Sequence, residues 1–402
     1  MRPISDWLAL RPAFFSLNND STQSPKIRLN QEQTETIQSY SFSKKTAFNT
    51  LKKPVLVSSL IIAGLSLQGF GEATQLDQVI ESQKLRVVSV AGDTTFFSRD
   101  SFLHGFGYEM SREFARDLNV KFEFKQVATT AAALDLVKKG KADIALTTAT
   151  TSQLQSKSLA AVDLTCGNTQ VLTTQGLDPA LNWAFRDGLD PLVGSSHGFV
   201  CEQRQIGSTK QLAAFYSRTM MNDQVERTAF AEALSTRLPL LKASFQMNAK
   251  QQKIDWQLLA AVSYQESHLV STAISPTGVT GLMMLTQGTA MQMGVKNRRD
   301  PVESIKGGAQ YLKLMQDQYT DIPNPDRVWF SLAAYNMGTG TLERVRTMLR
   351  KAGKNPNNWA DVFQYLADNK AKNTQYGQCM HYVTRIRGYL EAIKQDRNLT
   401  KI

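Results

Sequence analysis

Apolar residues follow two different spacings along the chain. Between positions 85 and 150, short runs of apolar and β-branched residues alternate with stretches in which apolar residues recur every three or four positions. Runs of the first kind predict β-strands, and stretches of the second kind predict helices. The expected strands lie at 85–92, 120–127 and 144–150, and the expected helices at 108–118 and 131–139. Strands and helices in alternation are typical of a parallel sheet covered by helices.

The second half of the chain shows the spacing of helices only. The stretch 223–244 is expected to be helical with an interruption near Pro239, because proline lacks a backbone N–H and its ring clashes with the preceding turn. These patterns predict an α+β chain of two domains. An α/β domain at 84–218 is followed by a helical linker at 219–250 and an all-α domain at 251–395.

One predicted helix carries an acidic residue on its apolar side. Asp255 should begin this helix, because its carboxylate can accept hydrogen bonds from the amides of the first turn. Leu258, Leu259 and Val262 then recur at helical spacing, and Glu266 falls on the same stripe. A buried carboxyl group is costly when ionised, so burial favours the protonated form, which can act as a general acid. For a lone glutamate, a cap or bridge at the edge of the face is the commoner explanation.

A turn and a second apolar segment follow this helix. In the turn 275–278, Pro276 fixes φ and Gly278 permits a positive φ, so the chain can double back over the helix. The apolar segment begins at 281–285. Farther along, the glycine pair 307–308 inside a predicted helix indicates close contact with another helix, since glycine otherwise weakens a helix.

Six short motifs occur in order in this half of the chain. They are ES at 266–267, SPTG at 275–278, GLM at 281–283, TAMQMGV at 289–295, AAYNMG at 333–338 and YVTRI at 382–386. Their order resembles the goose-type-lysozyme-like (SLT) catalytic domain of the lytic murein transglycosylases. The resemblance implies an enzyme, a carbon–oxygen lyase that breaks the β-1,4 bond between N-acetylmuramic acid and N-acetylglucosamine in peptidoglycan. It uses no water and leaves 1,6-anhydro ends.

The same resemblance implies roles for single residues. Glu266 corresponds to the catalytic residue, which protonates the glycosidic oxygen and then removes the proton of the muramyl 6-hydroxyl. Ser275 is expected to hydrogen-bond near this acid, and Tyr335 and Asn336 to position the acid and the sugar. The implied chemistry requires no metal and no cofactor.

Two further substrate-binding candidates depart from the pattern of many relatives. Met284 stands where many have Gln, although F-type membrane-bound transglycosylases also have two methionines there, and Gln378 stands where many have Glu. Each candidate also has a structural explanation. Ser275 and Asn336 can cap turns, and Tyr335 and Met284 can belong to the core.

The predicted α/β domain resembles the first lobe of a family 3 periplasmic solute-binding protein, in the segments 105–124 and 138–146. Such a domain precedes the catalytic domain in F-type transglycosylases. In the binding proteins an arginine clamps the carboxylate of the ligand, whereas the matching position here is Gln155, which cannot form a bidentate pair. The stretch is also too short for two lobes. We therefore expect a module that regulates or positions the catalytic domain, or a structural remnant, rather than an amino-acid receptor.

Composition and charge narrow the choice of partners. Apolar residues make up 42% and charged residues 20%, which is ordinary for a globular chain, and the formal net charge is +11. A basic chain attracts anionic partners such as the cell wall or a membrane surface. No zinc-ligand spacing, phosphate loop or basic–aromatic array indicates nucleic acid. Cys166 and Cys201 can pair in an oxidising compartment or remain buried thiols.

The N-terminal region predicts export. Residues 1–43 are polar without periodicity, as in a disordered leader. Residues 44–73 combine lysines, an apolar run and small residues, as in a signal peptide, with an uncleaved anchor at 54–71 as the alternative. The resemblance implies a periplasmic protein at the periphery of the outer membrane, with glycan strands and cell-wall synthesis proteins as partners. Inner-membrane anchoring through 54–71 is the alternative.

Two other functions fit the same residues. A hydrolytic muramidase on the same fold would release products without the anhydro ring. A peptidoglycan-binding or regulatory protein with a decayed site would retain the fold and lose the reaction, and Gln378 in place of Glu favours this alternative.

Overall fold

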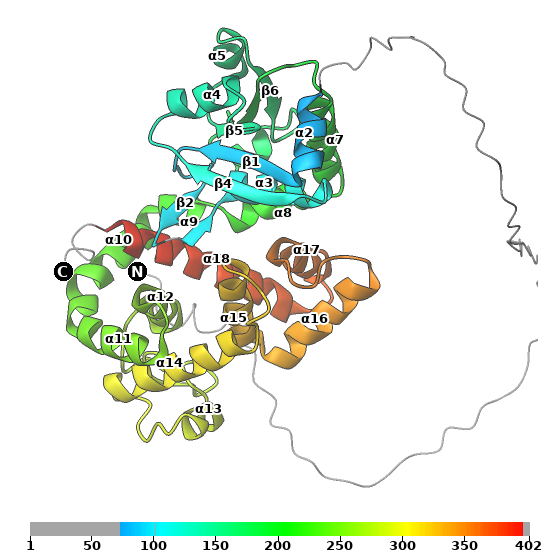
Figure 1. The fold of residues 1–402 in the computed structure, drawn as a ribbon. Helices are drawn as coiled ribbons and strands as arrows, with labels where there is room; N and C mark the ends of the chain where they lie inside the picture. Colours follow the sequence, from blue (N-terminus) through cyan, green and yellow to red (C-terminus); the bar gives the residue numbers. More distant parts are fainter. Residues whose placement is uncertain (1–72, 101, 397–402) are drawn as a thin grey trace, which may run out of the picture. The chain divides into compact units, whose positions relative to one another are not determined.

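The computed structural model describes residues 73–100 and 102–396 (Figure 1). The predicted leader at 1–43 and all but the last residue of the predicted signal peptide or anchor at 44–73 lie outside the described residues. The described residues belong to one compact unit. Among their helices, none combines the length and the hydrophobicity that a membrane crossing needs.

The first part of the chain folds around a five-stranded sheet with the strand order β4-β1-β5-β7-β6. Its elements are α2 (Gln75–Ser82), β1 (Lys84–Ser89), the hairpin β2 (Phe97–Arg99) and β3 (Phe102–His104), α3 (Phe106–Asp117), β4 (Lys121–Gln126), α4 (Thr130–Lys138), β5 (Ile144–Thr147), α5 (Thr151–Gln155), β6 (Ala160–Asp163), α6 (Gln170–Thr173), β7 (Asn182–Phe185), α7 (Pro191–Gln205) and α8 (Ser208–Phe215). All predicted elements of the α/β pattern are present. The prediction of parallel strands holds for β4, β1 and β5, whereas β7 runs antiparallel to both β5 and β6.

Helices cover both faces of this sheet, because successive side chains of a strand point to opposite sides. Val87 of β1 packs with residues of α3 and α7, whereas its neighbour Val88 packs with Leu134 and Val137 of α4. The first of these two cores is continuous with the core of the helical part. Every residue of β5 is buried, which explains the nearly continuous apolar run there, whereas the edge strand β4 has no buried residue and alternates apolar with polar side chains.

The second part of the chain is entirely helical, which confirms the predicted fold class of an α/β segment followed by an all-α segment. Its elements are α9 (Thr219–Asn222), α10 (Gln224–Glu232), the π-helix η1 (Ala233–Arg237), α11 (Leu238–Gln252), α12 (Trp256–Ser267), α13 (Gln287–Gln292), α14 (Pro301–Asp317), α15 (Asp326–Met337), α16 (Thr339–Lys351), α17 (Trp359–Asn369) and α18 (Thr374–Gln395). Pro239 stands in the first turn of α11, directly after η1, at the predicted interruption. The domain boundaries at 218, 250 and 395 stay predictions.

A buried ionic cluster connects α18 to the end of the sheet-containing part. Arg387 and Glu391 are each 1% exposed, and Arg387 Nη1 lies 2.6 Å from Glu391 Oε1. Arg387 also donates to the carbonyl oxygens of Phe215, at 3.0 Å, and Ser217, at 2.8 Å. Arg218 bonds to the other carboxylate oxygen of Glu391. The two arginines therefore surround one carboxylate, and α18 is held against the backbone that follows α8.

The electrostatics of this cluster favour an ionised Glu391. Burial alone disfavours the charge, but Arg387 and Arg218 outweigh it and hold the pKa of Glu391 below its usual value. The neighbouring His104 is neutral at pH 7, because burial lowers its pKa to about 3. The favourable charge pairs therefore involve the arginines, and the neutral imidazole packs among the rings of Phe97, Phe102, Tyr216 and Trp329.

We predict that Glu391→Gln destabilises the chain at pH 7 by about 3 kcal/mol, because the buried guanidinium group of Arg387 loses its counterion and the partly buried one of Arg218 loses its nearest carboxylate. The lowered pKa of Glu391 means that its stabilisation is present above the pKa of the unfolded state and is lost as the pH falls through the folded-state value. The unaltered chain and Glu391→Gln should therefore differ less in their free energy of unfolding at about pH 3 to 4 than at pH 7. Urea unfolding of both proteins at the two pH values measures this difference.

The matched control is Asp135→Asn, which removes the exposed pair between Lys139 Nζ and Asp135 Oδ2 at 2.8 Å. Its effect on the free energy of unfolding should stay below about 0.5 kcal/mol. A loss with Glu391→Gln that is equal at both pH values would contradict the proposed charge pairing.

Candidate active site

Glu266 lies near the C-terminal end of α12, a helix buried on nearly every side. Asp255 begins the helix as predicted, and its carboxylate accepts a hydrogen bond from the Gln257 amide at 2.8 Å. Glu266 is 5% exposed. The helix ends at His268, which adopts the left-handed conformation with φ 52°. The carboxyl group of Glu266 is thus buried with the rest of this largely apolar helix, as the sequence predicts.

Tyr382 of α18 contacts this carboxyl group. Its hydroxyl donates to Glu266 Oε1 at 2.7 Å, and the side chains of both residues are buried. Tyr382 belongs to the closing YVTRI motif of the family pattern, and the sequence alone does not indicate its contact with Glu266. A buried tyrosine hydroxyl usually has a hydrogen-bond partner, which is the one general rule that could have indicated a polar contact for Tyr382. A bond to one carboxyl oxygen orients the whole group.

The predicted turn at 275–278 makes the chain double back. Isolated antiparallel bridges join Ile274 to Thr280 and Thr280 to Leu285. Ser275 belongs to this turn: its hydroxyl accepts from the Val279 amide at 2.9 Å and pairs with the Thr277 hydroxyl at 3.0 Å. These contacts match the structural explanation for Ser275. Its predicted bond near Glu266 stays a prediction.

Side chains from three helices hold the segment 281–285. The Ser267 hydroxyl donates to the Leu282 carbonyl oxygen at 2.9 Å, and the Met283 amide donates to the Ser304 hydroxyl at 3.1 Å. Tyr335 of α15 donates its hydroxyl to the Met283 carbonyl oxygen at 2.9 Å. The segment is buried and has no regular ladder, so these side chains supply the partners that its backbone needs.

Met284 and the glycine pair of α14 reflect the same tight packing. Met284 is buried and has a φ of 44°, which is unusual for a residue other than glycine. A Cβ atom on Gly308 would overlap the side chain of Met283, and one on Gly307 would overlap Val295. The predicted close contact of 307–308 therefore exists, but its partner is this irregular segment and its continuation instead of another helix.

Asn336 and Gln378 each have a buried amide oxygen without a hydrogen-bond partner. They lie on neighbouring elements, because the Gln375 side chain of α18 donates to the carbonyl oxygen of Met337 of α15 at 3.3 Å. Gln378 lies one turn before Tyr382, so both side chains are on the same face of α18. A buried acceptor without a donor costs about 1 to 3 kcal/mol. Among the described residues, no hydrogen-bond donor is paired with either oxygen.

The sheet-containing part has a cavity of its own at the ends of β1 and β5. It has a volume of about 400 Å³ and is lined by 90–95, Thr130, Ala133, 146–148, Gly176 and Asp178. Gln155, the predicted counterpart of the carboxylate-clamping arginine, is exposed at the end of α5 and does not line this cavity. The side chain of Gln155 therefore contributes nothing to the wall of this cavity.

Comparison with known proteins supports the reading of the helical part. Residues 243–358 match the family model of the transglycosylase SLT domain. The chain is 42% identical over 224 residues to the membrane-bound lytic murein transglycosylase F of a Pseudomonas fluorescens strain. This match covers 53% of this chain and 46% of the relative, so it spans about half the length of the curated protein. The predicted resemblance to lytic transglycosylases is thus confirmed.

Two solved structures share limited similarity with the chain. An ancestral cationic amino acid solute-binding protein is 15% identical with a TM-score of 0.29, and the match covers 36% of this chain and 100% of the other. An inactive variant of the lytic transglycosylase Slt from Pseudomonas aeruginosa is 20% identical with a TM-score of 0.33, over 52% of this chain and 34% of the other. Both scores are too low for an argument about the fold.

We predict that Gly281→Ala destabilises the chain by about 3 kcal/mol or more, through backbone strain and overpacking. Gly281 has a φ of 90°, and an added Cβ would overlap the carbonyl oxygen of Arg298. The control is Gly278→Ala, with a φ of 76° and nothing within 4 Å of the added atom. This variant should lose only about 1 kcal/mol, the cost of the left-handed backbone. Similar losses in urea unfolding would contradict the packing described for 281–285.

Proposed function

We propose that this chain is a peptidoglycan lytic transglycosylase, which cleaves the β-1,4 bond between N-acetylmuramic acid and N-acetylglucosamine and leaves 1,6-anhydro-muramic acid ends. The observation that carries the proposal is the buried carboxyl of Glu266, oriented by the Tyr382 hydroxyl at 2.7 Å. It lies inside the segment that matches the transglycosylase SLT domain. The relatives are named lytic murein transglycosylases, and we propose the same chemistry for this chain.

One carboxyl group supports this reaction better than hydrolysis by a pair. An ordinary glycosidase places two carboxyl groups on either side of the scissile bond. Glu266 is the sole Asp or Glu in the stretches 263–285, 335–336 and 378–382, which form the site. A single acid suffices when the substrate supplies both the stabilising acetamido group and the attacking hydroxyl.

The proposed reaction uses Glu266 twice. The protonated carboxyl first donates its proton to the glycosidic oxygen, the bond between this oxygen and the anomeric carbon breaks, and the acetamido oxygen stabilises the positive charge. The resulting carboxylate then accepts the proton of the muramyl 6-hydroxyl while this oxygen bonds to the anomeric carbon. Glu266 is regenerated and no water enters. A hydrogen bond from Tyr382 stabilises the carboxylate formed between the two steps.

The remaining candidates have supporting roles in this proposal. Asn336 and Gln378 offer their unpaired amide oxygens to hydroxyl or amide N–H groups of the sugars. Tyr335 holds the segment 281–285 through the Met283 carbonyl oxygen. Met284 is a buried member of that segment, and Ser275 holds the preceding turn through the bond from the Val279 amide.

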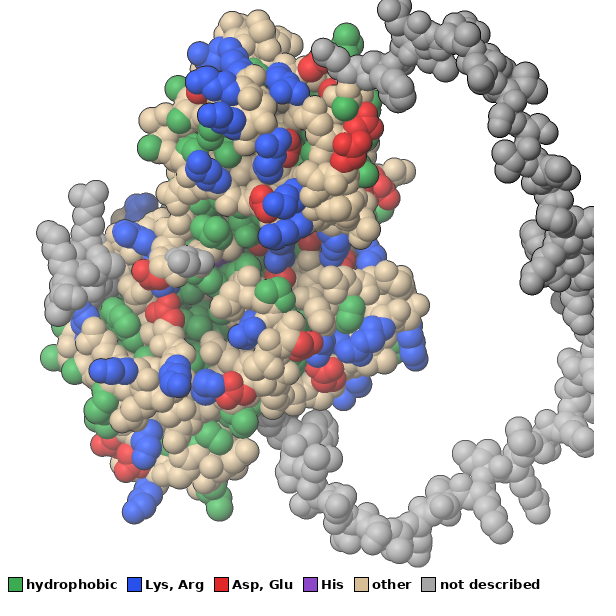
Figure 2. Space-filling view, in the orientation of Figure 1, with side chains coloured by type: hydrophobic (Ala, Val, Ile, Leu, Met, Phe, Trp, Pro, Cys, Tyr) green, Lys and Arg blue, Asp and Glu red, His purple; other side chains and the backbone are tan. Residues whose placement is uncertain are grey.

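The charge and the relatives also support a location in the cell envelope. Lys and Arg side chains gather on the visible face of the sheet-containing part (Figure 2), and the whole chain carries a formal charge of +11. Such a surface suits anionic wall polymers and membrane surfaces. The relatives are named membrane-bound, so we place the chain in the periplasm at the periphery of the outer membrane, with an inner-membrane anchor at 54–71 as the alternative. Cell-wall synthesis proteins are possible partners there.

The released products distinguish lytic cleavage from hydrolysis. Purified peptidoglycan incubated with the chain should release muropeptides lighter by one water than hydrolytic products, and Glu266→Gln should release none, because an amide cannot donate the proton. Mass spectrometry of the released fragments measures both. Hydrated products would instead identify a muramidase, and no release by the unaltered chain would favour a wall-binding protein.

In this proposal the Tyr382 hydroxyl positions the carboxyl group of Glu266. Tyr382→Phe should lower the rate of anhydro-product formation about 10- to 100-fold, the value of a hydrogen bond to a charged group. The control is Tyr365→Phe on α17, which should retain the rate and the thermal stability. An unchanged rate with Tyr382→Phe would contradict the role proposed for this hydroxyl.

A further inference from the structure

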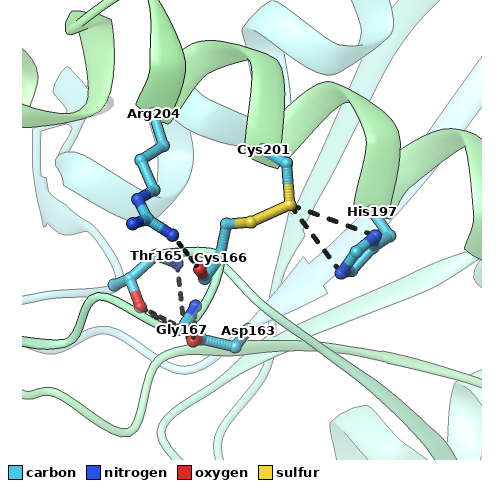
Figure 3. Close-up of a disulfide and its surroundings, with 7 residues drawn as sticks. All are labelled: Asp163, Thr165, Cys166, Gly167, His197, Cys201 and Arg204. Atoms are coloured by element: carbon cyan, nitrogen blue, oxygen red, sulfur yellow. Dashed lines mark hydrogen bonds between the residues drawn. A yellow bond between two sulfur atoms is a disulfide. The ribbon is translucent and has the colours of Figure 1, made fainter.

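Cys166 and Cys201, whose pairing the sequence left open, form a disulfide beside His197 (Figure 3). Cys166 lies in the turn after β6, and Cys201 lies in α7 one turn after His197. The Cys201 sulfur is 3.7 Å from His197 Nε2 and 4.0 Å from His197 Nδ1. The two sulfur atoms and an imidazole nitrogen all lie within 4.8 Å of one another. Three metal-ligating side chains thus converge on one point.

The turn that carries Cys166 is held in place by contacts other than the disulfide. The Asp163 carboxylate accepts from the amides of Thr165, at 2.9 Å, and Gly167, at 2.8 Å. Arg204 of α7 donates to the carbonyl oxygen of Cys166 at 2.7 Å. The backbone of the turn is therefore attached to α7 next to Cys201. Breaking the disulfide would leave the two sulfur atoms close together.

We propose that, after reduction of this disulfide, Cys166, Cys201 and His197 bind one thiophilic divalent metal ion such as Zn²⁺. Two thiolates and an imidazole are the ligand set that zinc prefers, with the fourth tetrahedral position taken by a water molecule. His197 and Cys201 are four residues apart on a helix, so both side chains are on the same face. The α7 face supplies two ligands and the turn supplies the third.

The chemistry balances with a dithiol as the reductant. The external dithiol gives two electrons and two protons, becomes a disulfide itself, and converts Cys166 and Cys201 into two thiols. Zn²⁺ then replaces the two thiol protons, which are released to the solvent, while His197 binds as the neutral imidazole. The connection between the turn and α7 is thus either a covalent bond or a metal bridge.

Solvent can reach this site. His197 is exposed, and both paired cysteines are only partly buried. The third cysteine of the chain, Cys379, is fully buried and free, so it cannot supply a ligand to an ion entering from solvent. The linear sequence did not indicate the site, because Cys166 is separated from Cys201 by 35 residues.

The test is a zinc titration of the full chain in competition with a chromophoric chelator. One sample is reduced with a phosphine and freed of reductant without air, and the other sample keeps its disulfide. We expect the reduced chain to bind one Zn²⁺ and the oxidised chain none, and Zn²⁺ to raise the melting temperature of the reduced chain only. A reduced chain without stoichiometric binding, whether folded or not, would overturn the proposal.

Variants separate this site from adventitious binding. His197→Ala should weaken the affinity of the reduced chain at least about tenfold, and Cys166→Ser should abolish stoichiometric binding. His381→Ala, at an exposed histidine of α18, is the matched control and should leave the affinity unchanged. Co²⁺ in place of Zn²⁺ should show thiolate-to-metal absorption that is lost with Cys166→Ser. Equal affinities for His197→Ala and the unaltered chain would rule out the three-ligand site.

Discussion

The bond between the Tyr382 hydroxyl and Glu266 depends on the position of one long helix, and this constraint organises the helical part. The two residues are 116 positions apart in the chain, so only the packing of α18 against α12 brings them to 2.7 Å. Arg387 and Glu391 fix the same helix farther along, through the backbone at Phe215 and Ser217. Glu391 lies nine residues after Tyr382, about 13 Å along the helix axis. The backbone at Phe215 and Ser217 therefore helps to fix the position of α18, and with it the position of Tyr382.

A second constraint is the irregular segment 281–285, which is buried without forming regular secondary structure. Each buried carbonyl and amide of such a segment needs a partner, because water cannot reach it. Ser267 satisfies Leu282, and Ser304 and Tyr335 satisfy the two polar backbone groups of Met283. Small or polar residues on three helices thus decide where this segment lies beside Glu266. The glycines of α14 leave room for its side chains.

The features that the sequence predicts well are those set by neighbouring residues. Asp255 begins its helix, Pro239 follows an interruption, and the turn at 275–278 reverses the chain, since each depends on local backbone chemistry. The partner of the Tyr382 hydroxyl, the antiparallel direction of β7 and the disulfide depend on distant segments meeting, which periodicity does not encode. Ser275 shows the intermediate case. Its place in a turn is predictable, but the structure adds only contacts inside that turn.

The two unpaired amide oxygens suit the glycan binding that we propose for this site. A core that served stability alone would lose about 1 to 3 kcal/mol for each buried acceptor without a donor, and an apolar side chain of similar shape would avoid this cost. Asn336 of α15 and Gln378 of α18 retain such acceptors where the two helices adjoin, and Gln378 is on the same face of α18 as Tyr382, which bonds to Glu266. Sugars carry hydroxyl and acetamido N–H donors at high density. Binding of a glycan strand, as proposed, would supply donors to these two oxygens, so the cost that weakens the free chain would favour the complex.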